Sequence, residues 1–137
     1  MTPALYLSSK ALAVLASGGP SRSKLVAVLR AWLEEGGELA TSGYSIGNFV
    51  AQCVSDRNSL TGVRDFLRDL DGLCSEVLEP SGADLMRALD LVDAHSISYG
   101  EAVELALALD RESTRVVLGP DLPGQSGLPL YHFDVDD

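Results

Sequence analysis

The feature that most constrains this chain is a regular alternation of short apolar runs with longer segments of helical periodicity. Apolar runs at 4–7, 39–41, 76–78 and 115–118 are predicted to form buried strands, and 128–133 a last edge strand. Two segments with apolar residues at helical spacing lie between each of the first four runs. This order predicts an α/β fold of three layers, α/β/α, in which helices cover both faces of a mainly parallel sheet of four to five strands.

Several expected helices have clear start signals. Ser81 with Asp84, and Ser98 with Glu101, have the spacing of a capping box, in which side chain and backbone bond reciprocally. Ser21 or Ser23 is expected to cap the helix that ends at Gly36, and Thr61 to open a later helix. The helix over 102–109 is apolar nearly all round, which predicts burial on most sides.

The size and composition favour one intracellular domain. The chain has 137 residues, of which 46% are hydrophobic, so 1–133 is expected to form a single domain and 134–137 an acidic tail. No apolar run approaches the roughly 18 residues that a membrane span needs, so no membrane association is expected. Cys53 and Cys74 form no C-x-x-C pair and are predicted to be free thiols, which favours a cytoplasmic location.

The charge balance limits the partners. Twenty acidic residues against ten basic ones give a net charge of −10, which is poorly suited to nonspecific contact with phosphates. Arg64 and Arg68, one helical turn apart, leave a local basic patch open, although a solvated helix face is the simpler interpretation.

Candidate site residues follow from the expected topology, because ligands of open parallel sheets bind beyond the carboxyl ends of the strands. The residues predicted there are mostly hydroxyls and an amide, with two carboxylates. They are Ser8 and Ser9 after the first strand, Thr41, Ser42 and Asn48 after the second, Ser96, Ser98 and Glu101 at the start of the apolar helix, and Asp121 after the fourth strand.

The same stretches resemble the PIN domains, a family that includes the toxin ribonucleases of bacterial toxin–antitoxin pairs, and the resemblance covers nearly the whole chain. The family's first strand ends in an Asp within an L-D-[ST]-[SN]-x-L pattern, where this chain has Leu7-Ser8-Ser9-Lys10-Ala11-Leu12. Its second acid is a Glu, where this chain has Asn48-Phe49-Val50-Ala51. Its third lies in a stretch matched best by Ile97-Ser98-Tyr99-Gly100-Glu101-Ala102, and its fourth aligns with Asp121 to within one residue.

The resemblance implies a metal-dependent ribonuclease fold with a degenerate acidic site. In the family these acids hold Mg²⁺ or Mn²⁺, which activate water at a phosphodiester. Here Ser8 and Asn48 are neutral, which leaves Glu101 and Asp121 as the remnant catalytic and metal-binding residues, with Asp93 or Glu104 as possible help. No cofactor is expected, or Mg²⁺ or Mn²⁺ if the residual site is functional.

Two functions follow from this resemblance. The first is a PIN-like protein, non-catalytic or weakly active, that binds RNA or a protein partner such as an antitoxin-like protein. The alternative is a Mg²⁺- or Mn²⁺-dependent endoribonuclease toxin of a toxin–antitoxin pair. A homodimer is expected in either case.

Simpler roles compete for the same residues. Ser8, Ser9 and Glu101 fit helix caps, and Asp121, between two prolines, fits a turn. A separate motif, G-x-S-x-G at 43–47, is placed like the nucleophile elbow of a serine hydrolase with Ser45 as nucleophile. Only one strand precedes it, whereas that hydrolase fold builds most of its sheet first, so a hydrolase is disfavoured.

Overall fold

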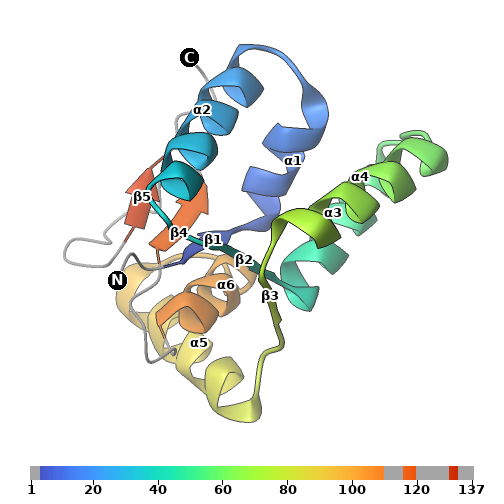
Figure 1. Cartoon of the computed structure of the whole chain (residues 1–137). Coiled ribbons are helices and arrows are strands. Elements are labelled where there is room, and N and C mark those ends of the chain that lie inside the picture. The colour runs from blue at the N-terminus through green and yellow to red at the C-terminus, as the bar shows by residue number, and fades with distance from the viewer. Residues whose placement is uncertain (1–3, 110–115, 120–129, 133–137) are drawn as a thin grey trace.

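The computed structural model describes residues 4–109, 116–119 and 130–132, and in this part of the chain the sheet has five strands (Figure 1). They are β1 (Leu5–Leu7), β2 (Leu39–Ser42), β3 (Glu76–Leu78), β4 (Val116–Gly119) and β5 (Leu130–His132). Their order is β3-β2-β1-β4-β5, and every pair of neighbours is parallel. The predicted parallel sheet and its edge strand are confirmed. Asp121 and the 134–137 tail lie outside the described residues.

In the described part of the chain, six helices cover the two faces of this sheet (Figure 1). One layer holds α1 (Ser9–Ser17), α2 (Pro20–Glu34), α3 (Gly43–Ser55) and α4 (Leu60–Leu73). The other layer holds α5 (Gly82–His95) and α6 (Tyr99–Leu109). The three-layer α/β/α architecture is therefore as the alternation of segments predicted.

The two layers have separate apolar cores because side chains alternate across a strand. Leu5 and Leu7 of β1 point into the core formed with α1 to α4, whereas Tyr6 points into the core formed with α5 and α6. All three are fully buried. The central strand thus supplies apolar contacts to both helical layers, as expected of a strand in the middle of a parallel sheet.

Helix starts agree with the sequence in part. The capping box of Ser81 and Asp84 is confirmed, with both reciprocal bonds present. The expected cap at Ser21 or Ser23 is wrong, because α2 begins at Pro20 with Gly19 as its N-cap, and proline suits a first helical position, where no N–H is needed. For α4 the cap is Ser59, whose side chain accepts from the amide of Gly62, so Thr61 lies inside the helix.

The apolar helix α6 is buried as predicted. Residues 102–108 are all buried, and Glu104 is the one charged residue among them. Because α6 leads into the parallel strand β4, it runs against the strand direction and begins at the carboxyl edge of the sheet. Its first turn therefore meets the residues that follow β1 and β2.

Both cysteines are free, with Cys53 buried and Cys74 half-buried. None of the helices in the described part of the chain is long and apolar enough to cross a membrane.

Candidate functional site

A buried carboxyl group, that of Glu104, lies at the carboxyl edge of the sheet beside the start of α1. Its side chain accepts hydrogen bonds from the backbone N–H of Ser9 at 2.6 Å and from the Ser9 hydroxyl at 3.1 Å. The hydroxyl of Ser45, in the first turn of α3, donates to it at 2.5 Å. Glu104 is only 5% exposed. One carboxyl group therefore ties α6 to the starts of α1 and α3.

From Ser45 the network continues to two further hydroxyl groups, those of Tyr6 and Ser42. The Ser45 hydroxyl lies 2.7 Å from that of Tyr6 and 3.1 Å from that of Ser42. The Tyr6 and Ser42 hydroxyls are 2.6 Å apart. All three residues are buried, and the groups satisfy one another, which removes most of the cost of burying polar atoms.

Burial raises the pKa of Glu104 above its ordinary value of 4.5, because desolvation disfavours the charged carboxylate. Hydrogen bonds from Ser45 and Ser9 act in the opposite direction, and the nearby charge of Glu101 adds to the increase. Desolvation is the largest of these effects. The folded protein thus retains the proton of Glu104 to a higher pH than the unfolded chain does.

A pocket of about 400 Å³, lined mostly by polar residues, opens above Glu104, between the starts of α1 and α6 and the first turns of α3. Its lining includes most of the predicted site residues together with two that sequence reasoning did not single out, Lys10 and Gln52. The lining residues are Ser9, Lys10, Ala13, Asn48, Phe49, Gln52, Ser98, Gly100, Glu101 and Glu104. Lys10 Nζ lies 3.3 Å from Glu101 Oε1, which joins the two sides of the pocket.

Four predicted residues, Ser9, Asn48, Ser98 and Glu101, therefore meet at one pocket, although they come from three distant segments. Ser8 does not line it: this buried residue is the N-cap of α1 and accepts from the amide of Ala11 at 3.2 Å, the simpler role considered for it. The Ser98 hydroxyl accepts from the amide of Glu101, which is half of the expected capping box, whereas the Glu101 carboxylate accepts from Lys10.

Of the two auxiliary acids, Asp93 is exposed on α5 and lies away from the pocket. Glu104, in contrast, lies at the centre of the hydrogen-bond network. It could have been found in the sequence as the single acidic residue among the apolar residues 102–108. A charged residue flanked by buried Val103 and Leu105 needs a polar partner, because an unpaired buried charge is costly.

Among the described residues, the donors at this pocket do not match the ligand set of a divalent cation of the Mg²⁺ or Mn²⁺ type. Such ions need several oxygen ligands, preferably anionic. Ser8 is used as a helix cap, Asn48 is neutral, Glu101 is paired with Lys10, and both oxygens of Glu104 already accept hydrogen bonds. Within the described residues, no three His, Cys, Asp or Glu side chains are grouped to hold a metal ion.

The G-x-S-x-G motif does not form a nucleophile elbow. Ser45 is fully buried, and its hydroxyl is engaged by Glu104, Tyr6 and Ser42. A nucleophile must be reachable by substrate, so the serine-hydrolase alternative is contradicted.

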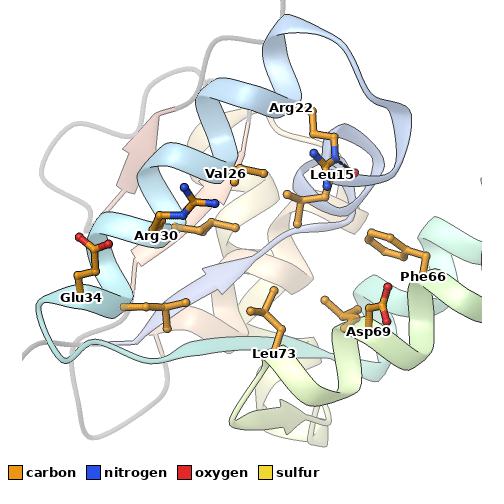
Figure 2. A pocket seen from close by; sticks show the side chains of 11 residues that line it. Leu15, Arg22, Val26, Arg30, Glu34, Phe66, Asp69 and Leu73 are labelled. Atoms are coloured by element: carbon orange, nitrogen blue, oxygen red, sulfur yellow. Dashed lines mark hydrogen bonds between the residues drawn. The ribbon is translucent and has the colours of Figure 1, made fainter.

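A second cavity, a groove of about 560 Å³, lies in the layer of α1 to α4 and is mainly apolar (Figure 2). Its walls come from α1, α2 and α4, and charged side chains stand among the apolar ones. The lining residues are Leu15, Arg22, Val26, Leu29, Arg30, Leu33, Glu34, Phe66, Asp69, Leu70 and Leu73. Arg22 donates through Nε to the carbonyl oxygen of Leu15 at 2.9 Å, which connects α1 and α2 at one end of the groove.

The layer order, the parallel sheet and the pocket at its carboxyl edge define a PIN-like fold. Among solved structures, the chain is similar to the Mycobacterium tuberculosis toxin VapC20, a PIN-domain protein described as cleaving the sarcin–ricin loop. The two superpose with a TM-score of 0.67 over 86% of this chain and 90% of that one, at 14% sequence identity. At this identity the likeness shows the fold alone. No family model and no curated protein matches the sequence.

Proposed function

We propose that this protein is a PIN-like domain that acts by binding a protein partner and does not cleave RNA efficiently. The observation that carries the proposal is that both carboxyl groups lining the pocket are already paired with other groups of the protein. Glu104 is bonded to Ser9 and Ser45, and Glu101 is paired with Lys10. A catalytic metal site needs these carboxylates to be available to an ion.

The two neutral positions strengthen the argument. Ser8 and Asn48 stand where the resemblance implies carboxylates. Opposite unit charges about 4 Å apart attract by about 4 kcal/mol at a surface-like dielectric, which is on the order of a thousandfold in affinity. Two missing carboxylates are therefore enough to remove useful affinity for Mg²⁺ or Mn²⁺.

The apolar groove supports a protein partner. Leu33 and Leu73 on its rim are each 40% exposed, and apolar side chains around a groove are typical of a surface that receives an amphipathic helix. The groove is also lined by charged side chains of both signs, Arg22 and Arg30 on α2 with Glu34 and Asp69, so it suits a partner segment that carries both acidic and basic residues beside its apolar ones (Figure 2). An antitoxin-like protein with such a segment is the partner we propose.

The catalytic half of the proposal is tested by incubating the purified protein with structured and single-stranded RNA in Mg²⁺ or Mn²⁺. We expect no cleavage above that of the Glu101→Gln variant. The double variant Ser8→Asp/Asn48→Glu should fold, because Asp is also a good N-cap and Asn48 is exposed. Metal-dependent cleavage by the natural chain that is lost in Glu101→Gln contradicts the proposal.

The binding half is tested with the product of the neighbouring reading frame, by calorimetry. Leu33→Glu places a charge on the rim of the groove and should weaken binding at least tenfold, since one buried apolar side chain contributes about 1.5–3 kcal/mol. Leu89→Glu is the matched control, because Leu89 is 60% exposed on α5, in the opposite helical layer. If both variants lose the same affinity for the partner, or if neither loses any, the result counts against a binding site in the groove.

The alternative is a dimeric Mg²⁺- or Mn²⁺-dependent endoribonuclease toxin. Its specific support is the likeness to VapC20, which is described as an RNA-cleaving toxin, and the presence of Glu101 and Glu104 at one pocket. In this case Glu101→Gln abolishes cleavage. Light scattering separates a monomer of 14.5 kDa from a homodimer of twice that mass.

A further inference from the structure

Among the described residues, one positively charged group lines the pocket above Glu104, the ammonium group of Lys10. Lys10 comes from the first turn of α1 and Glu101 from the first turn of α6, 91 positions apart. Their ion pair crosses the mouth of the pocket, with the Lys10 side chain 55% exposed and that of Glu101 26% exposed. Glu104 lies beneath them and is almost fully buried.

The two carboxyl groups of this pocket interact with each other. Both line it and lie three positions apart on α6, on the same side of the helix, so the two repel when both are ionised. A positive charge nearby offsets this repulsion. Lys10 is the one cationic residue that lines the pocket in the described part of the chain.

We infer that Lys10 takes over the electrostatic role of a divalent cation in this pocket. Its ammonium group compensates Glu101 and holds the starts of α1 and α6 together, and it repels any dication that approaches the same carboxylates. This repulsion opposes the binding of Mg²⁺ and Mn²⁺. The cost of dehydrating the ion and the small number of anionic ligands oppose it as well. The positive charge of Lys10 thus disfavours the binding of a divalent cation in this pocket.

This inference concerns the pocket of the proposed function, and it is tested by metal binding in the absence of RNA and partner, so the two can fail separately. Mn²⁺ affinity is measured by calorimetry and by the loss of the free-ion electron paramagnetic resonance signal. Lys10→Met should bind Mn²⁺ at least tenfold more tightly than the natural protein, because a neighbouring unit charge has been removed. Lys10→Arg keeps the charge and should behave as the natural protein does.

Lys24→Met is the matched control, because it makes the same change in net charge on α2, outside the pocket. It should leave Mn²⁺ affinity unchanged. The double variant Lys10→Met/Glu101→Gln should lose this increase in Mn²⁺ affinity, because the ion is expected to bind at Glu101. Circular dichroism checks that each variant is folded. The inference is overturned if Lys10→Met binds Mn²⁺ no more tightly than the natural chain, or if the natural chain already binds it at micromolar concentration through Glu101.

Discussion

The carboxyl group of Glu104 can be replaced in two ways that separate its hydrogen bonds from its proton. Glu104→Gln keeps the shape and one acceptor oxygen. Placed where Oε2 lies, the amide oxygen still accepts from the Ser9 N–H and the Ser45 hydroxyl. The amide NH₂ then faces the Ser9 hydroxyl, which can rotate and accept. We therefore expect Glu104→Gln to cost no more than about 1 kcal/mol at acidic pH.

Glu104→Leu has a similar volume and removes every acceptor. The Ser45 hydroxyl can still pair with Tyr6 or Ser42, so the loss falls mainly on the Ser9 N–H. A buried donor without a partner costs about 1–3 kcal/mol, and this is the expected loss in the free energy of unfolding.

The pH dependence follows from the raised pKa of Glu104. Between the ordinary value of 4.5 and the raised folded-state pKa, the unfolded chain has lost this proton and the folded chain retains it. The unfolded state then binds fewer protons, so the free energy of unfolding falls as pH rises through this window, by about 1.4 kcal/mol for each unit of elevation. Above the folded-state pKa the contribution is constant.

The assay is urea unfolding, followed by circular dichroism, of the natural protein and of Glu104→Gln between about pH 5 and pH 8. Subtracting one curve from the other removes the contribution of the other carboxyl groups, which both proteins share. The natural protein should lose stability relative to Glu104→Gln as pH increases. Parallel curves would refute the argument from burial, and a leucine variant as stable as the natural protein would refute the argument from hydrogen bonding.

Two further predictions concern the cap of α1 and the half-buried thiol. Ser8→Ala removes the acceptor for the Ala11 amide and should lower the free energy of unfolding by about 1 kcal/mol in urea titration; an unchanged value would show that the cap contributes nothing. Burial, with a smaller effect of Asp71, raises the pKa of Cys74 to about 11. The rate of its alkylation by iodoacetamide, followed by mass spectrometry, should therefore still increase at pH values where the rate for an ordinary thiol is already constant.

The likeness to VapC20 and the internal pairing of the pocket bear on different questions. The superposition concerns the path of the backbone, and this chain has the same layers and sheet over most of its length. Chemistry depends on a few side chains at the carboxyl edge, where Ser8 and Asn48 are neutral and Lys10 is paired with Glu101. A shared fold therefore does not imply a shared reaction.

The order of elements was predictable from the sequence because it depends on local rules. Apolar periodicity distinguished strands from helices, and the Ser81–Asp84 capping box marked the start of α5 at the observed residue. The parallel topology followed from the alternation of elements, and it placed Ser9, Asn48, Ser98 and Glu101 at one edge before any contact was known.

The tertiary structure alone decided how those residues are used. Glu104 bonds to Ser9 across 95 positions of the chain and Lys10 pairs with Glu101 across 91, and no local pattern specifies such partners. The apolar stripes of α2 and α4 likewise look the same in sequence whether they face a core or a groove. Periodicity and caps act over a few residues, whereas burial, charge compensation and cavities arise only when distant segments are packed together.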